Sequence, residues 1–192
     1  ASYRPDICPP AKEAKKIYNE IIAYLAIKTD LILIETMCSI DQAEGALLAS
    51  KKIKKPVWIS FSVDDFDGSK LRSGEEVEKI DLIIKKFNPD AVLINCSRPE
   101  VVASALKIIS AFDVKYGAYA NGFTKITSGF LKDAPTVDAL EERKDLNPES
   151  YSKFVMEWVN LGATIVGGCC EVGPDHIKLI AQKLNKSGFN IV

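Results

Sequence analysis

Short apolar runs alternate with longer segments of helical periodicity along the whole chain. The runs are rich in β-branched residues and nearly free of charge, which is typical of strands buried on both faces of a parallel sheet. Strands are predicted over residues 30–35, 57–63, 91–96, 116–121 and 164–169. Helices are predicted over residues 10–27, 41–52, 73–87, 99–112, 148–161 and 174–186. This alternation indicates βα units and an α/β fold.

Residue types at the predicted helix starts support these boundaries. Ser39 stands where an N-cap is expected, and acidic side chains open the helix at 73–87, where the helix dipole favours them. Proline stands near the first turn of the helices that begin at 99, 148 and 174.

No linker divides the chain, so residues 1–192 are predicted to form a single domain. Its long non-periodic segment is 123–147, and a loop of that length in a compact domain is usually functional. We therefore expect this segment to form a lid or a rim.

The composition excludes several classes of protein. With 47% hydrophobic residues and a net charge of −1, the chain is neither disordered nor suited to nucleic acid, which requires a concentrated positive surface. Its apolar runs are shorter than the ~20 residues of a membrane span. The N-terminus lacks the pattern of a signal peptide. It also lacks a starting Met, as expected of a sequence that begins within a longer protein.

The cysteines are odd in number and scattered, and two are adjacent: Cys8, Cys38, Cys96, Cys169 and Cys170. Such a set is a poor disulfide framework, so we expect a reducing, cytoplasmic compartment with thiols available as ligands or reactants. Cys8 and Cys38 are expected to be small buried hydrophobic residues.

Cys96, Cys169 and Cys170 stand at the carboxyl ends of predicted strands, the edge at which α/β proteins bind ligands. Neighbouring residues of a strand point to opposite faces, so both adjacent cysteines can face one metal only if the backbone leaves the strand there. The preceding Gly167 and Gly168 permit such a departure. Three thiolates suit Zn²⁺ and leave its fourth position open, as in catalytic sites. The alternative is a tight strand-to-helix turn with buried cysteines.

The segments LILIETM (31–37), VLINCSRPE (92–100) and GATIVGGCCEVGPDHI (162–177) resemble the homocysteine S-methyltransferase family. The resemblance implies a zinc-dependent (β/α)8 TIM barrel in which Cys96, Cys169 and Cys170 hold the metal. It also implies that the homocysteine thiolate fills the fourth position and that methionine is the product. No catalytic residue is expected beyond the metal site.

Other residues at the same edge are weaker candidates. The resemblance implies that Glu35 contacts the homocysteine ammonium, the alternative being a rim carboxylate that caps the next helix. Asn95 and Asn121 end strands and have either substrate contacts or ordinary turn roles. The single histidine, His176, is expected to be structural.

The five predicted strands correspond to the fourth to eighth strands of the family's barrel, so the first three βα units are apparently absent. A barrel without them has exposed edges, and self-association or a complementing N-terminal segment is expected. The preferred methyl donors are S-methylmethionine and S-adenosylmethionine, with betaine as the alternative. Two other functions stay open: a non-catalytic zinc- or thiol-binding partial barrel, and a different α/β enzyme with redox-active cysteines.

Overall fold

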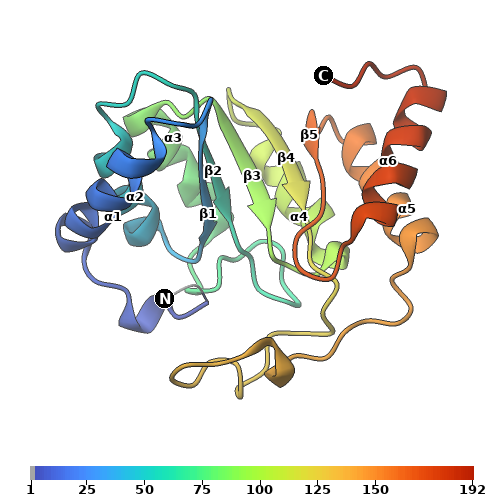
Figure 1. Cartoon of the computed structure of the whole chain (residues 1–192), viewed down its shortest axis with the longest axis horizontal. Helices are drawn as coiled ribbons and strands as arrows, with labels where there is room; N and C mark the ends of the chain where they lie inside the picture. Colours follow the sequence, from blue (N-terminus) through green and yellow to red (C-terminus); the bar gives the residue numbers. More distant parts are fainter. Residues whose placement is uncertain (1–2) are drawn as a thin grey trace.

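The computed structural model describes residues 3–192, and its centre is a parallel sheet flanked by helices (Figure 1). The strands are β1 (Ile32–Met37), β2 (Val57–Phe61), β3 (Ala91–Asn95), β4 (Lys115–Tyr119) and β5 (Ile165–Val166). The α-helices are α1 (Ala11–Leu25), α2 (Ile40–Ser50), α3 (Ile80–Phe87), α4 (Pro99–Ile109), α5 (Pro148–Asn160) and α6 (Pro174–Lys186). Short 3₁₀ helices cover Pro5–Ile7, Val77–Lys79 and Val137–Ala139.

The strands lie side by side in chain order, β1-β2-β3-β4-β5, and each pair is parallel. The helices follow in the same sequence, from α1 at one end of the sheet to α6 at the other (Figure 1). The predicted α/β fold is therefore confirmed. Within residues 3–192 the sheet stays open, with β1 and β5 as its two edges.

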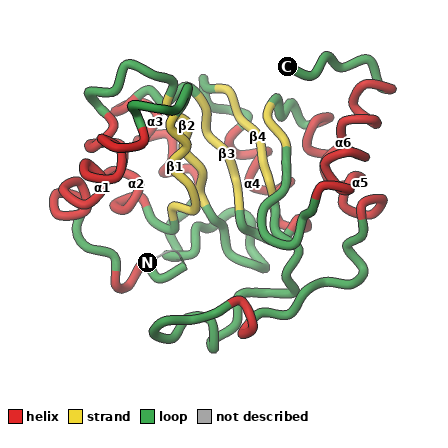
Figure 2. Tube along the Cα trace, in the orientation of Figure 1, coloured by secondary structure: helices red, strands yellow, loops and turns green. Residues whose placement is uncertain are grey.

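All carboxyl ends of the strands meet at one edge of the sheet, and the long loop at 123–147 lies beyond that edge (Figure 2). Apart from the 3₁₀ turn Val137–Ala139, this loop contains no helix or strand, as predicted. The amide of Ile126 donates 2.6 Å to the carboxylate of Asp65, which ties the loop to the segment after β2.

The core lies between the sheet and the helices. Every residue of β3 is buried, as expected of a central parallel strand. The prediction of burial on both faces is wrong for β1, in which Leu33 and Glu35 are exposed. In its first four residues burial alternates with exposure, so the described part of the chain covers only one face of this edge strand there.

The helix starts mostly agree with the sequence. The hydroxyl of Ser39 accepts a hydrogen bond from the amide of Gln42 at 3.1 Å, which confirms the expected N-cap. The helix predicted from residue 73 is wrong at its start, because Gly74 has a φ of +85° and belongs to a turn. The acidic Glu75 instead accepts a hydrogen bond of 3.0 Å from the amide of Ile40, at the start of α2.

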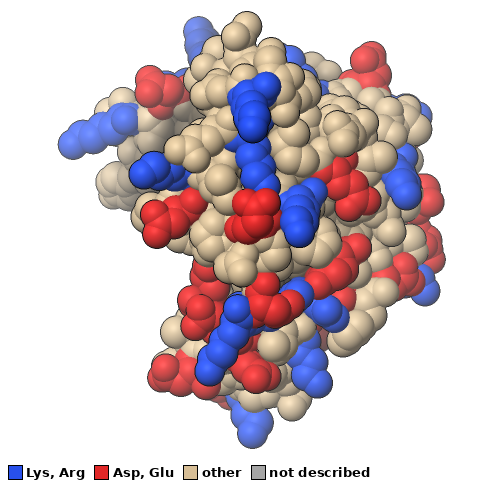
Figure 3. All heavy atoms as spheres, turned by 90° about the vertical axis from the view of Figure 1, so that its right-hand side faces the viewer, with Lys and Arg blue, Asp and Glu red and all other residues tan. Residues whose placement is uncertain are grey.

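The helices described for residues 3–192 include none with the length and apolar content of a bilayer span. On the face of the molecule shown in Figure 3, acidic and basic side chains are interspersed, without a large block of either sign. This distribution agrees with the nearly balanced charge of the sequence.

Candidate metal and substrate site

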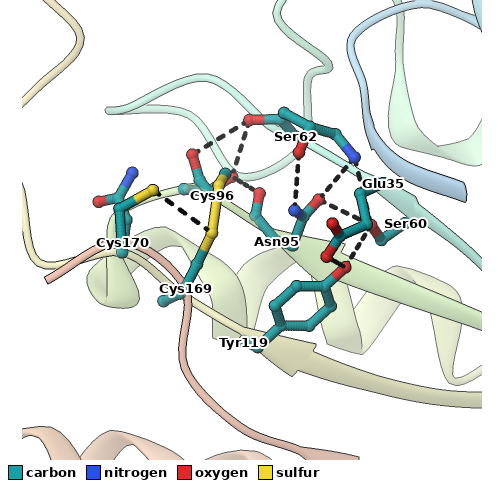
Figure 4. Close-up of a disulfide and its surroundings, with 12 residues drawn as sticks. Glu35, Ser60, Ser62, Asn95, Cys96, Tyr119, Cys169 and Cys170 are labelled. Atoms are coloured by element: carbon teal, nitrogen blue, oxygen red, sulfur yellow. Dashed lines mark hydrogen bonds between the residues drawn. A yellow bond between two sulfur atoms is a disulfide. The ribbon is translucent and has the colours of Figure 1, made fainter. Parts of the chain in front are cut away.

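The structure brings together the three cysteines that the sequence places at strand ends. Cys96 follows β3 directly, and Cys169 and Cys170 follow β5 after a short extended segment (Figure 4). The three Sγ atoms all lie within 4.8 Å of one another. Cys96 is buried, Cys169 is half-buried and Cys170 is exposed, so the cluster is open to solvent on one side.

The assigned strand β5 ends at Val166, but the amides of Gly167 and Cys169 still donate to the carbonyls of Ala118 and Ala120. The chain then turns at residues 170–171, which allows both adjacent cysteines to face the same point. A Cβ atom on Gly168 would lie 2.1 Å from Cγ1 of Val172, so only glycine fits at this position before the turn. The amide of Cys169 donates to the carbonyl of Ala120 at 2.9 Å and fixes the turn against the end of β4. The two neighbouring sulfur atoms consequently lie 3.8 Å apart.

Cys96 and Cys169 are joined by a disulfide in the structure. Their Cα atoms are 5.8 Å apart, a usual separation for such a bond. The cysteine count alone predicted no disulfide, and that prediction is wrong for this pair. The reason is that the fold brings two strand ends together that are 73 residues apart in the chain.

The donor set fits a soft divalent metal ion once the disulfide is reduced. Zinc–sulfur bonds of about 2.3 Å in a tetrahedron separate the sulfur atoms by about 3.8 Å. The sulfur atoms of Cys169 and Cys170 have that separation, 3.8 Å. Partial desolvation of the Cys170 sulfur raises the pKa of this thiol above its ordinary value. A bound metal cation would act in the opposite direction and favour the thiolate.

Glu35 lies at the same edge of the sheet, beside a tyrosine from another strand (Figure 4). The hydroxyl of Tyr119 donates to Oε1 of Glu35 at 2.9 Å and lies 2.7 Å from the hydroxyl of Ser60. Burial raises the pKa of Tyr119 far above its ordinary value, so this phenol stays protonated and available as a donor. The Glu35 residue itself is exposed and can accept a further cationic partner.

Asn95 is fully buried, and its amide is occupied by neighbouring protein groups. Its Nδ2 donates to the hydroxyl of Thr36 at 2.8 Å, and its Oδ1 accepts from the hydroxyl of Ser60 at 2.8 Å. Thr36 has a φ of +60°, which is unusual for a β-branched residue. The observed contacts of Asn95 therefore hold the backbone that follows Glu35.

Asn121 and His176 also make contacts within the protein. The side chain of Asn121, which is almost fully buried, accepts a hydrogen bond of 3.2 Å from the amide of Phe123 and so supports a turn. His176 accepts from the amide of Gly173 at 3.2 Å, and its other ring nitrogen lies 3.0 Å from the carbonyl of Leu146. The structural role expected for His176 is confirmed.

The cysteines outside the cluster also agree with the sequence in part. Cys38 is fully buried, as expected, and burial raises its thiol pKa to about 11. Cys8 is only half-buried.

The buried pair of Arg72 and Asp65, which lies next to Cys96, was missed by sequence reasoning. Charged residues in an irregular segment carry no periodic signal that could have identified them.

Comparisons with known proteins agree with this architecture. Homocysteine S-methyltransferase 1 of Arabidopsis thaliana is 29% identical over 161 residues, which cover 82% of this chain and 47% of that protein. Homocysteine S-methyltransferase 2 of Zea mays is 32% identical over 162 residues, covering 82% of this chain and 45% of that protein. The chain thus spans about half the length of these curated relatives.

The fold is similar to that of a solved homocysteine methyltransferase, MmuM from Escherichia coli. Its metallated form has a TM-score of 0.71 at 20% identity, covering 95% of this chain and 55% of that chain. Its apo form has a TM-score of 0.70 at 19% identity, covering 93% and 59%. At this level of sequence identity, the structural similarity supports a shared fold only. The sequence model described as homocysteine S-methyltransferase matches residues 2–184, and the chain therefore belongs to the homocysteine S-methyltransferase family.

Proposed function

We propose that this chain is the homocysteine-binding part of a zinc-dependent methyltransferase that converts homocysteine to methionine. The observation that carries the proposal is the cluster of three cysteine sulfur atoms within 4.8 Å at the carboxyl edge of the sheet. Cys96, Cys169 and Cys170 would hold the zinc ion. The proposal includes a reducing compartment such as the cytoplasm, since all three ligands must be thiols.

Thiol chemistry explains why such a site is useful. A free thiol has a pKa of about 8.5 and is a weak nucleophile at neutral pH. Coordination to zinc supplies the deprotonated thiolate, so no separate general base is required. In the transfer, the bond between the methyl carbon and the donor heteroatom breaks and its electrons stay with the donor. A new carbon–sulfur bond forms on homocysteine.

The chain's own residues would bind and orient the amino acid. The Glu35 carboxylate can accept hydrogen bonds from the homocysteine ammonium, and charge-assisted bonds of this kind are among the stronger ones in proteins. Tyr119 holds one oxygen of that carboxylate at 2.9 Å, which restricts its orientation. Asn95 supports the backbone beside Glu35 because its Oδ1 accepts a hydrogen bond of 3.1 Å from the amide of Thr36.

For the methyl donor we propose a sulfonium compound, S-methylmethionine or S-adenosylmethionine, with betaine as the alternative. Each carries a positive charge that disappears from the donor as the methyl group leaves.

We further propose that residues 1–192 are the C-terminal part of a (β/α)8 barrel. The open edges β1 and β5 and the half-length match to the curated relatives support this interpretation. Three further βα units, or a second chain, would cover the edges. Either arrangement would also complete the wall of the substrate site.

A second candidate function is thiol redox chemistry, which the disulfide between Cys96 and Cys169 favours. The two functions differ in their metal content. A redox protein would cycle between dithiol and disulfide without zinc. The methyltransferase would hold one zinc ion per chain when its thiols are reduced.

The test is to purify the chain under reducing conditions, measure zinc per chain, and incubate it with homocysteine and each donor in turn. The incubation is repeated after the addition of the N-terminal half of a relative. One zinc per chain and methionine formation with a donor are expected. If zinc is bound but no methionine forms, with or without the added N-terminal half, the chain would be a non-catalytic zinc-binding partial barrel. Absence of zinc together with ready disulfide cycling would favour the redox function.

A further inference from the structure

The backbone at Cys96 has an unusual conformation for a residue with a side chain. Its φ is +48°, in the left-handed region, which non-glycine residues seldom adopt unless their surroundings impose it. Its amide donates to the carbonyl of Tyr119 at 3.3 Å, so the residue still touches the neighbouring strand on that side. The conformation aims the Cys96 sulfur at those of Cys169 and Cys170, as Figure 4 shows.

Three donors from other parts of the chain hold the carbonyl oxygen of Cys96. Nη2 of Arg72 donates to it at 3.2 Å, and the hydroxyl of Ser62 donates at 3.2 Å. The hydroxyl of Tyr3 lies 3.4 Å from the same oxygen. Nε of Arg72 also donates to the Ser62 hydroxyl at 2.7 Å, so the guanidinium holds this carbonyl both directly and through Ser62.

The guanidinium is itself fixed by buried partners. The side chains of Arg72 and Asp65 are only 9% and 7% exposed, and their closest nitrogen–oxygen distance is 2.7 Å. The second carboxylate oxygen of Asp65 accepts from the amide of Ile126 at 2.6 Å. The ring of Tyr3 lies 4.8 Å from Cζ of Arg72.

Burying two opposite charges has a large desolvation cost, which the attraction between them only partly offsets. Such a pair is therefore a poor source of stability, although it fixes geometry well. The planar guanidinium of Arg72 donates hydrogen bonds to three groups at once. They are the Asp65 carboxylate, the Ser62 hydroxyl and the Cys96 carbonyl.

We propose that Arg72, with Asp65 as its buried counter-ion, is a positioning residue that holds Cys96 in its left-handed conformation and so aims the thiol at the other two cysteines. The inference rests on the proposed metal site but concerns the cysteine geometry, which can be measured without metal. Arg72 touches the backbone of Cys96 and not the sulfur atom, so it acts on the metal through the position of that residue.

The test compares Arg72→Met with Arg143→Met in the chain. Arg143 is a matched control because its side chain is 12% exposed and it pairs with Asp145 at 2.7 Å and with Glu100, whereas none of its side-chain hydrogen bonds in the described residues reaches Cys96. The first measurement is zinc affinity, by competition with a chromophoric chelator under reducing conditions. The second is the rate at which Cys96 and Cys169 form a disulfide in the metal-free chain with oxidised glutathione, followed by peptide mass mapping.

Arg72→Met is expected to lose about 10-fold or more in zinc affinity, the usual effect of removing a group that orients a ligand. It should slow disulfide formation between Cys96 and Cys169 to a similar degree, while Arg143→Met keeps both values. If Arg72→Met does not fold by circular dichroism, Arg72→Lys replaces it. That variant keeps the positive charge opposite Asp65 but lacks the planar guanidinium group. A smaller loss of zinc affinity and of the disulfide rate is therefore expected.

Wild-type affinity and rate in a folded Arg72 variant would overturn the proposal, and so would equal losses in Arg143→Met. A wild-type chain that binds no zinc would contradict the proposed function. The disulfide rate would still test the role of Arg72 in that case.

Discussion

The hydroxyl of Tyr119 on β4 donates a 2.9 Å hydrogen bond to the carboxylate of Glu35 on β1, 84 residues earlier in the chain. Two strands lie between them in the sheet. Neighbouring strands are about 4.8 Å apart, so β1 and β4 would be about 14 Å apart in a flat sheet. The two side chains therefore reach toward each other across the same face of the sheet, over β2 and β3. Ser60 of β2 lies along this path, 2.7 Å from the Tyr119 hydroxyl.

Replacement of Glu35 by Gln should weaken homocysteine binding and leave zinc in place. A hydrogen bond to a charged group contributes about 1.5–3 kcal/mol, so kcat/KM for homocysteine should fall about 10-fold to 100-fold. The measurement is steady-state methionine formation in a chain extended by three preceding βα units, together with zinc content. Glu20→Gln, on the exposed side of α1, is the control. Unchanged kinetic constants in Glu35→Gln would leave this carboxylate as a rim residue.

Replacement of Cys169 by Ala should remove most of the zinc and all homocysteine methylation, because two thiolates hold zinc poorly. The same outcome is expected for Cys96→Ala and Cys170→Ala. Cys8→Ser is the control, since Cys8 lies outside the sulfur cluster. Zinc per chain is measured by atomic absorption after dialysis in a reducing buffer. Full retention of zinc by Cys169→Ala would contradict the assignment of the ligands.

The sequence predicts the strands and the position of the cysteine cluster because both follow from local patterns. Apolar β-branched runs identify β1 to β5, and in parallel strands residues at the carboxyl ends meet at one edge. The disulfide between Cys96 and Cys169 and the network around Arg72 are not predictable in this way. They depend on contacts between segments distant in the chain, whose side-chain geometry no periodicity encodes.

The helix predicted from residue 73 illustrates the same limit. Acidic residues after a Ser-Gly pair are typical of a helix start, yet Glu75 is used at the start of α2 instead. A tertiary contact has replaced the local preference. The strand β5 covers only Ile165–Val166, which is shorter than the predicted range 164–169. The amide of Cys169 still donates to the carbonyl of Ala120, and the chain turns directly afterwards, which brings the cysteines together.

Stability should decrease at alkaline pH because of Tyr151. Burial raises the pKa of this phenol above its ordinary value, and its hydroxyl donates to the carbonyl of Gly167 at 2.9 Å. The unfolded chain loses the phenol proton near pH ~10, whereas the folded chain keeps it. The contribution of this phenol to stability is thus complete below pH ~10 and is lost as the pH rises further.

The measurement is the melting temperature of wild type and Tyr151→Phe between neutral pH and pH ~11. The variant should be less stable at neutral pH by about 1 kcal/mol, because a hydrogen bond is lost. Its melting temperature should then fall less steeply above pH ~10, since one raised pKa has been removed. Equal alkaline slopes for the two proteins would contradict this role of Tyr151.

The last prediction concerns the exposed surface of the open sheet. Helix α1, which packs against α2 at the β1 end of the sheet (Figure 1), exposes Ile17, Ile21, Tyr24 and Leu25. Apolar side chains next to an unpaired strand edge favour association with another chain. We therefore expect the 192-residue chain to self-associate and to be a poor enzyme.

A chain extended by three preceding βα units, taken from a full-length relative, should behave differently. The added strands would pair with β1 and β5 and restore the missing wall of the site, so this longer chain should be less prone to associate and should form methionine. Sedimentation velocity and methionine formation are compared for both lengths at equal zinc content. The cysteine-bearing strand ends are present in both, so zinc binding alone should differ little. A monodisperse 192-residue monomer with full activity would contradict both the missing units and the partial barrel.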